Sequence, residues 1–456
     1  MNSVMNVTFP ASLDLIVIGG GPAGYSAAIR AAQFGNSVLL VEKERLGGAC
    51  LNSGCIPTKF LWETLNLEKK IKRAADHGFA HVPARPEFSL VQQKKNKAID
   101  IIGHGLQNLL ASYPITIIEG TAHFTGHRQV AITTRDGAIT EAQASKIIIA
   151  TGSRPRDIPE LGIDPIRIIN SDDALRLGGV PKTMAIIGAG AIGVEFAFIF
   201  AGFGCDVTLI EKESHILPAE DGELSSEVKK LLQRQGVKVI ESAGTLEPLI
   251  RDAEQVLVAT GRQPNIETLN LPAAKINFNE NGITVNAYLE TSQNGVYACG
   301  DVTGKNYLAY IAQAEGIAAA ENIHGGKNTI DYSTTPRVIF SQPPIASAGK
   351  RPKDCDPAEV ITGRFPFTAN SRAFIEGERT GWVKVLVEKK TGLIAGCQVI
   401  GAEAEALISI ISMALKRKTT VNDLKREMFF HPSMAESIFG ACEDAFNKCI
   451  DLPNKI

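Results

Sequence analysis

One pattern occurs twice in this chain of 456 residues, in segments 13–44 and 182–213. Each copy reads as a buried strand, a Gly-x-Gly-x-x-Gly turn, a helix and a second strand that ends in a glutamate. In both copies the glutamate comes 23 positions after the first glycine. The defining residues are Gly19, Gly21, Gly24 and Glu42 in the first copy, and Gly188, Gly190, Gly193 and Glu211 in the second.

This repeated pattern predicts two dinucleotide-binding folds. Glycines allow the backbone to approach a pyrophosphate, and the N-terminus of the following helix attracts its negative charge. The terminal glutamate accepts hydrogen bonds from ribose hydroxyls. A single glycine motif also occurs as the turn of a nucleotide-free α/β fold. Two copies with the same spacing to an acid favour the nucleotide sites.

The repeat extends beyond the glycine turns. KIIIATGSRP (146–155) and QVLVATGRQPN (255–265) are both buried strands that break at Ala-Thr-Gly, and one follows each dinucleotide unit. NGVYACGDVTG (294–304) predicts a further strand, which ends in Gly-Asp. Segment 309–325 predicts a helix of small residues that is suited to close packing.

A different kind of domain is predicted from about residue 331. Segment 381–401 alternates like a half-buried hairpin with Lys-Thr-Gly at its turn. A helix is expected at 403–416, followed by FFHPSMAESIFGACEDAF (429–446). These features predict an α+β domain.

The composition and the N-terminal sequence argue against several classes of protein. Hydrophobic residues make up 44% and charged residues 21%, and the net charge is -2, so no global attraction to nucleic acid or anionic lipid is expected. The first basic residue is Arg30, so no secretory or transit signal is evident. No apolar run approaches the length that crosses a bilayer. We expect a cytoplasmic protein without nucleic-acid or membrane partners.

Two cysteines, Cys50 and Cys55, lie five positions apart in GGACLNSGCIPTK. A regular helix would place them near opposite faces, and a strand would separate their Cα atoms by roughly 16 Å. A disulfide needs Cα atoms within about 7 Å. The stretch is therefore a bent backbone, a metal knuckle or two unrelated thiols. Without an export signal, a reactive pair here would be catalytic or redox-active.

Taken together, these motifs resemble the pyridine nucleotide–disulfide oxidoreductases, and among them most closely the dihydrolipoamide dehydrogenases. GGACLNSGCIPTK, the two glycine units, LPAEDGE, both Ala-Thr-Gly strands, CGDVTG and HPSMAES carry the resemblance from about residue 13 to 446. It implies an α/β fold with two Rossmann-like domains, for FAD and NAD, plus a C-terminal α+β dimerisation domain. The expected boundaries are 1–152 (FAD, first part), 153–275 (NAD), 276–330 (return to the FAD domain) and 331–456 (dimerisation).

The resemblance also assigns a role to each of the two cysteines. It implies a redox disulfide in which Cys55 faces the flavin and Cys50 exchanges with substrate. Asn52, Ser53 and Gly54 tolerate the distorted backbone that such a bridge needs, and a helix that begins here lowers the pKa of a thiol at its N-terminus. Zinc would need two further ligands at close spacing, and the other cysteines are scattered.

Four further residues take catalytic roles by resemblance. Lys59 follows Cys55 by one helical turn and pairs with Glu195 beside the flavin. Glu195 lies in the apolar stretch AIGVEFAFIF, where a charge needs a partner; the alternative is a solvated Lys59. His431 is the base that takes a proton from the substrate dithiol, and Glu436 orients its ring.

The resemblance extends to the cofactor sites. For FAD it implies Gly19, Gly21, Gly24, Glu42, Lys59, Gly120, Thr151, Gly152, Ser153, Asp301 and Ala309; for NAD it implies Gly188, Gly190, Gly193, Glu195, Glu211 and Gly261.

The expected activity is oxidation of dihydrolipoamide with NAD+, in a homodimer whose active sites are shared between chains. The expected partner is the lipoyl domain of a 2-oxo acid dehydrogenase or glycine cleavage complex. The rivals are another NADH-linked disulfide reductase and a non-catalytic, NADH-sensing flavoprotein subunit. An NADP-linked glutathione-type enzyme fits poorly because Glu211 stands where such enzymes carry basic residues. Mercuric reductase would need a terminal cysteine pair, and the tail has only Cys449.

Four departures from the family pattern stand out. Ser433 replaces the usual threonine of His-Pro-Thr, and Pro343-Pro344 replaces a usual Pro-Glu. Phe429-Phe430 precedes His431, where smaller or polar residues are more common. The segment between VKVIES and QVLVATG is shorter than the usual three-stranded excursion, so part of that meander is expected to be missing.

Overall fold

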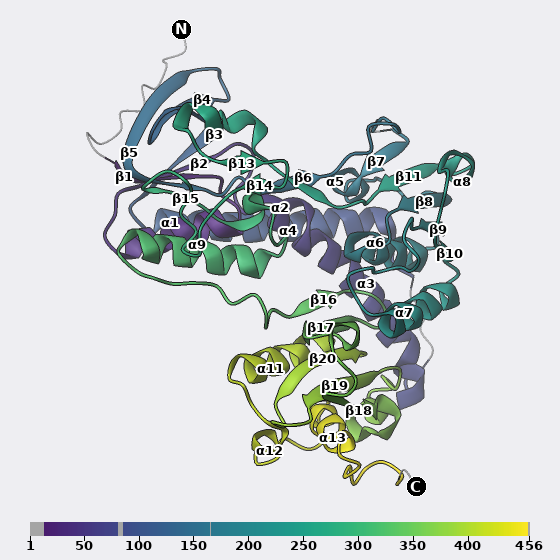
Figure 1. Cartoon of the computed structure of the whole chain (residues 1–456). Helices are drawn as coiled ribbons and strands as arrows, with labels where there is room; N and C mark the ends of the chain where they lie inside the picture. Colours follow the sequence, from purple (N-terminus) through teal and green to yellow (C-terminus); the bar gives the residue numbers. More distant parts are fainter. Residues whose placement is uncertain (1–12, 81–84, 165, 455–456) are drawn as a thin grey trace.

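The computed structural model describes residues 13–80, 85–164 and 166–454. Figure 1 shows three parts: a first nucleotide domain with α1 and α9 beneath its sheet, a second nucleotide domain built around α6, and a C-terminal domain that carries α11 to α13. Among the residues described, no helix is both long enough and apolar enough to span a bilayer.

The first nucleotide domain is built on a six-stranded sheet. The pairs β3–β2, β2–β1, β1–β5 and β5–β15 are parallel, and β3, β4 and β5 also form an antiparallel meander. β2 is buried along its whole length, as a strand covered on both faces must be. The strands are β1 (Leu13–Ile18), β2 (Val38–Glu42), β3 (Ile115–Gly126), β4 (Gln129–Thr134), β5 (Ile139–Ile149) and β15 (Val296–Ala298).

Helices cover this sheet and reach towards the second domain. The helices are α1 (Pro22–Gln33), α2 (Gly48–Ser53), α3 (Cys55–Arg73), α4 (Phe88–Ala111) and α9 (Ala309–Ile323). The predicted small-residue helix is α9, and it lies alongside α1 (Figure 1). Gly316 permits the close approach, because a Cβ there would lie 2.1 Å from the Ala23 carbonyl oxygen.

The second nucleotide domain has five parallel strands in the order β10-β9-β8-β11-β7. Residues 241–254 between β10 and β11 are all described and contain only the short helix α8 and no strand, in line with the expected loss of part of the meander. The elements are β7 (Ile168–Asn170), α5 (Ser171–Ala174), β8 (Thr183–Ile187), α6 (Ala191–Gly202), β9 (Asp206–Ile210), α7 (Gly222–Arg234), β10 (Lys238–Ile240), α8 (Glu247–Ile250) and β11 (Gln255–Val258).

The two Ala-Thr-Gly repeats connect these domains. The residues after each repeat form β6 (Ser153–Pro155) and β12 (Arg262–Pro264), which pair antiparallel with each other. Beyond β12, Leu269 and Leu271 pack in the core of the first domain. We therefore propose that the chain re-enters the first domain just after β12, a few residues before 276.

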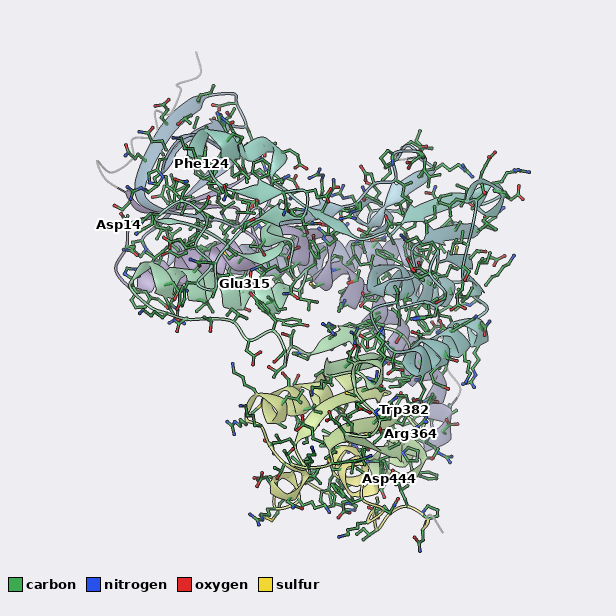
Figure 2. The ribbon with its side chains drawn as sticks, viewed as in Figure 1. Asp14, Phe124, Glu315, Arg364, Trp382 and Asp444 are labelled. Atoms are coloured by element: carbon green, nitrogen blue, oxygen red, sulfur yellow. The ribbon has the colours of Figure 1, made fainter. Side chains whose placement is uncertain are left out.

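The C-terminal domain has an antiparallel sheet in the order β16-β17-β20-β19-β18. The predicted hairpin is β19–β20, and the predicted helix is α11. In Figure 2, Arg364 and Trp382 lie side by side in this domain, with the guanidinium carbon 4.6 Å from the ring centroid. The elements are β16 (Arg337–Ile339), β17 (Ile345–Gly349), β18 (Val360–Pro366), α10 (Ser371–Ile375), β19 (Trp382–Glu388), β20 (Ile394–Ile400), α11 (Ala404–Lys416), α12 (Val421–Leu424) and α13 (Glu436–Asp444).

The close contact between α1 and α9 predicts that a side chain at Gly316 destabilises the protein, whereas a side chain at Gly105 in α4 does not. Gly316→Ala should force the helices apart and destabilise the protein by roughly 1–3 kcal/mol. Gly105→Ala, in the middle of α4 with open space around its Cα, should be neutral or stabilising by up to about 1 kcal/mol. Thermal unfolding of both variants measures the difference. Equal midpoints would contradict the close packing at Gly316.

Candidate active site

A cavity of about 1330 Å³ runs along the first nucleotide domain towards α6 and the C-terminal domain. Many of the predicted cofactor-binding and catalytic residues line it: Gly19, Gly21, Glu42, Cys50, Cys55, Lys59, Gly120, Thr151, Gly152, Ser153, Glu195, Asp301 and Ala309. Other predicted site residues are described but lie outside its lining: Gly24, Gly188, Gly190, Gly193, Glu211, Gly261, His431 and Glu436.

The glycine turn of the first copy leaves no room for side chains. Gly19 has φ +103°, and a Cβ there would lie 2.3 Å from the Ala150 carbonyl oxygen. A Cβ at Gly24 would lie 1.8 Å from the carbonyl oxygen of Gly19, which explains why Gly24 shapes the turn without lining the cavity. α1 begins at Pro22, inside the glycine motif, and its first residues line the cavity. This is the cradle that a pyrophosphate requires.

Glu42 and Glu211 hold the two glycine turns in the same way. The Glu42 carboxylate accepts hydrogen bonds from the backbone N–H of Gly20 (2.7 Å) and Glu44 (2.8 Å). The Glu211 carboxylate accepts from the N–H of Ala189 (2.7 Å) and Glu213 (3.0 Å). Each oxygen keeps a second lone pair for a ribose hydroxyl. Both acids thus shape their turn as well as present an acceptor.

The predicted NAD residues gather at the carboxyl ends of the second sheet. Gly188 follows β8, Glu211 follows β9, and Gly261 lies in a left-handed turn (φ +113°) after β11. A ligand binds at this edge of a parallel sheet, where α6 also begins. The turn repeats the first copy, because a Cβ at Gly193 would lie 1.9 Å from the Gly188 carbonyl oxygen. These residues fit a dinucleotide.

Asp301 lines the cavity and lies inside a polar network. Its carboxylate accepts a hydrogen bond from the Ser153 hydroxyl (2.5 Å), and Arg262 donates to that same hydroxyl (2.7 Å). Burial raises the pKa of Asp301. The buried Glu315 of α9, labelled in Figure 2, accepts from the Gly300 N–H (2.6 Å) and the Tyr332 hydroxyl (2.6 Å). The Gly-Asp turn is therefore fixed from two sides.

The cysteine stretch has the bent backbone that the spacing required. Cys50 lies in α2 and Cys55 is the first residue of α3, and the two helices break at Gly54. Both thiols are free in this structure and hydrogen bond to one another. No group of three or more His, Cys, Asp and Glu side chains that could hold a metal ion occurs in residues 13–80, 85–164 and 166–454. A metal knuckle here therefore has no ligand set in this part of the chain.

The pKa values of the two thiols are shifted in opposite directions. The hydrogen bond from Cys50 lowers the pKa of Cys55 to about 7, assisted by the Lys59 cation and opposed by burial. The same hydrogen bond and burial raise the pKa of Cys50. Cys55 at the start of α3 is thus the more acidic of the two thiols, as expected at a helix N-terminus.

Lys59 pairs with Glu195 across two domains. Its ammonium nitrogen lies 3.0 Å from Glu195 Oε2 and 3.2 Å from Oε1. Phe340, directly after β16, donates its backbone N–H to Glu195 Oε1 at 3.0 Å, and its ring centroid lies 4.4 Å from the Lys59 ammonium. The pair therefore connects α3, α6 and the C-terminal domain beside Cys55.

His431 and Glu436 form a hydrogen-bonded pair away from this cavity. His431 Nδ1 lies 2.9 Å from Glu436 Oε1, and the Ser433 N–H donates to Glu436 Oε2 at 2.8 Å. The His431 side chain is 70% exposed. In Figure 1, α13, which begins at Glu436, lies far from α2. One chain alone therefore does not bring His431 to Cys50.

The two phenylalanines before His431 differ. Phe429 packs against the C-terminal core, with its ring centroid 6.2 Å from that of Phe439. Phe430 is 77% exposed. Phe430 is thus the member of the pair that is free to face a substrate or a second chain.

Sequence reasoning missed Arg262, Glu315 and Phe340. Glu315 carried a usable signal, because it is an acid in a helix of small residues, as Glu195 is an acid in an apolar helix. Arg262 and Phe340 carried none, since each acts on residues more than 100 positions away in the chain.

Two family models match the chain. The pyridine nucleotide-disulphide oxidoreductase model matches residues 13–316, and the dimerisation domain of the same family matches residues 335–442. A dihydrolipoyl dehydrogenase from Bacillus subtilis (strain 168) is 35% identical over 449 residues, which cover 94% of this chain and 98% of the relative.

Two solved structures show the same fold. LpdA from Mycobacterium tuberculosis aligns with a TM-score of 0.86 and 27% identity, covering 94% of this chain and 99% of the other. The Cu(II) complex of the HOCl-induced flavoprotein disulfide reductase RclA from Escherichia coli aligns with a TM-score of 0.84 and 26% identity, covering 95% and 99%. With the cradle and the thiol pair described above, these matches show that the chain belongs to the pyridine nucleotide–disulphide oxidoreductases, flavoprotein enzymes that use FAD and NAD(H) and form homodimers through their C-terminal domain.

Proposed function

We propose that this protein is an NAD-dependent dihydrolipoamide dehydrogenase. The observation that carries the proposal is the hydrogen-bonded Cys50–Cys55 pair in the flavin cavity, with Cys55 as the more acidic thiol. The name of the Bacillus subtilis relative supports the substrate class. The proposed partner is the lipoyl domain of a 2-oxo acid dehydrogenase or glycine cleavage complex.

The proposed reaction begins with Cys50 and Cys55 joined as a disulfide. His431 takes a proton from a substrate thiol, and the resulting thiolate attacks the sulfur of Cys50. Cys55 leaves as a thiolate. The protonated His431 gives its proton to Cys50 as the second substrate thiol attacks the substrate sulfur of the mixed disulfide, the bond to Cys50 breaks and the oxidised substrate is released. His431 then holds the proton that the second substrate thiol gives up. FAD, held by the glycine cradle and Glu42, would supply an acceptor for the electron pair of the reduced cysteines and a hydride donor to NAD+.

The environment of Cys55 favours its departure from the disulfide as a thiolate. A thiol with a low pKa is the better leaving group in an exchange reaction. The Lys59 ammonium and the start of α3 stabilise the negative charge that Cys55 gains. Cys50, with its raised pKa, keeps a proton once the reaction is complete.

The base is proposed to come from a second chain. His431 is exposed and lies outside the cavity of its own chain, while the family forms dimers through this domain. We place His431 of the partner subunit over Cys50, with Glu436 of the partner subunit orienting the ring. The proposed site is therefore shared between two chains.

A second candidate is a different NADH-linked disulfide reductase. The similarity to RclA favours it, because that protein is a disulfide reductase of the same fold. Phe430 is exposed beside His431, where smaller or polar residues are more common in the family, so the substrate is proposed to differ as well. A third candidate, a flavoprotein subunit that senses NADH without turnover, would not need the paired acidities of Cys50 and Cys55.

One assay tests the first candidate against the other two. The purified FAD-loaded dimer is given dihydrolipoamide with NAD+, and separately glutathione disulfide with NADPH. The proposal expects rapid turnover of the first pair and very little of the second. Turnover of neither pair, with intact FAD binding, would count against the first candidate and favour the second or the third.

Glu211 predicts the choice of nucleotide. A 2′-phosphate would meet its carboxylate in a partly desolvated site, where like charges repel. We expect at least ~100-fold higher kcat/KM for NAD(H), a difference of about 2.7 kcal/mol. Steady-state kinetics with NADH and NADPH measure the ratio, and comparable values for the two would contradict the role of Glu211.

The Lys59 ammonium is expected to lower the pH at which Cys55 loses its proton. In a Cys50→Ser background, where the serine hydroxyl can still donate, Cys55 should lose its proton well below pH 9, so the thiolate is present above that midpoint and is lost as the pH falls through it. Lys59→Met should raise the midpoint by about one pH unit, because an opposite charge is removed. The rate of alkylation of Cys55 by iodoacetamide against pH measures this. Lys70→Met, which removes an exposed charge further along α3, serves as the control and should leave the midpoint unchanged.

A further inference from the structure

Phe340 touches both members of the ion pair beside the redox thiol. It lies in the C-terminal domain directly after β16 and lines the flavin cavity. Its backbone N–H donates to Glu195 Oε1 at 3.0 Å, and the Lys59 ammonium lies 4.4 Å from its ring centroid. Neither the FAD cradle nor the proposed exchange chemistry accounts for these two contacts.

The two contacts restrict different motions. A lysine ammonium is a point charge on a flexible four-carbon stem, and a carboxylate partner alone leaves it several positions. The ring face attracts the ammonium from a second direction. Glu195 Oε1 accepts from both Lys59 (3.2 Å) and the Phe340 N–H, so the carboxylate is tied to the C-terminal domain as well as to α3.

We infer that Phe340 is a positioning residue, whose ring holds the Lys59 ammonium beside Cys55 and whose backbone N–H holds Glu195. Docking of the dimerisation domain thereby sets the charge environment of the redox thiol in the neighbouring domain. The inference rests on the proposed role of Cys55 as the thiolate of the redox pair.

The titratable groups around Cys55 come from five elements. Cys50 of α2, Lys59 of α3 and Glu195 of α6 act on the thiol, and the Cys55 charge in turn raises the pKa of Tyr25 of α1 and Tyr310 of α9. Within this set Lys59 supplies the positive charge and Glu195 the opposing negative charge. A Lys59 ammonium that moves away from Cys55 therefore destabilises the thiolate and raises the pKa of the thiol.

Trp62 provides a matched control at the same junction. Its indole N–H donates to the Ser341 carbonyl oxygen at 2.8 Å, and its ring packs edge-on against Phe340 with centroids 5.2 Å apart. Trp62→Phe removes this hydrogen bond between the domains but keeps an aromatic neighbour for Phe340. It loosens the domain contact without removing the ring over Lys59.

The test compares Phe340→Leu, Phe340→Tyr and Trp62→Phe in the Cys50→Ser background, each loaded with FAD. Alkylation of Cys55 by iodoacetamide is followed by mass spectrometry across the pH range. Phe340→Leu should raise the midpoint by about 0.7 pH unit, which lowers the thiolate fraction and the rate at pH 7 about threefold. Phe340→Tyr keeps the ring and should restore the parent midpoint. Trp62→Phe should also leave the midpoint unchanged, even where it lowers the unfolding temperature.

Three results would overturn the inference. The first is an unchanged midpoint in Phe340→Leu. The second is an equal shift in Trp62→Phe, which would assign the effect to domain docking in general rather than to the ring. The third is a parent protein in which Cys55 titrates near pH 9; this result removes the proposed thiolate role, whereas the first two leave it standing. Phe340→Met lacks an aromatic face and keeps a long apolar side chain, so it gives the same test if the leucine variant does not fold.

Discussion

The ion pair between Lys59 and Glu195 is the contact on which the arrangement of the site depends. Lys59 comes from the helix that begins with Cys55, and Glu195 comes from an otherwise apolar helix of the NAD domain. Both side chains are partly buried, so removal of one partner would leave the other charge without compensation. The pair fixes how the two nucleotide domains meet and, at the same time, places a cation beside the redox thiol.

The two nucleotide domains build their glycine turns in the same way. In each nucleotide domain a glycine turn excludes side chains, a helix N-terminus follows, and a glutamate at the end of the second strand accepts backbone N–H groups of the turn. The antiparallel pair β6–β12 then joins the two copies, and Arg262 of the second copy reaches Ser153 of the first. Residues of the second nucleotide domain, Glu195 and Arg262 among them, therefore line part of the cavity that starts at the first glycine turn.

Local patterns were enough to predict much of this structure. The glycine turns, the hairpin β19–β20 and the small-residue helix α9 follow from spacing within a short window, whereas the shortened segment before β11 was predicted by comparison with the family pattern. The buried charge of Glu195 also pointed to a partner. Sequence could not reveal Arg262 or Phe340, because their contacts depend on how separate domains pack. The same limit applies to His431: its pairing with Glu436 is local, but its distance from Cys50 depends on the whole fold.

The central claim is that two chains build each active site, and a mixed dimer tests it most directly. One chain carries Cys50→Ser and the other carries His431→Gln, and removal of the base alone should cost roughly 10²–10⁴-fold in rate. Both homodimers should be inactive or nearly so. If the sites are shared, the purified heterodimer has one site with both defects and one intact site, so dihydrolipoamide oxidation returns to about half of the parent rate. Verified heterodimers that stay as inactive as the two homodimers would contradict the shared site.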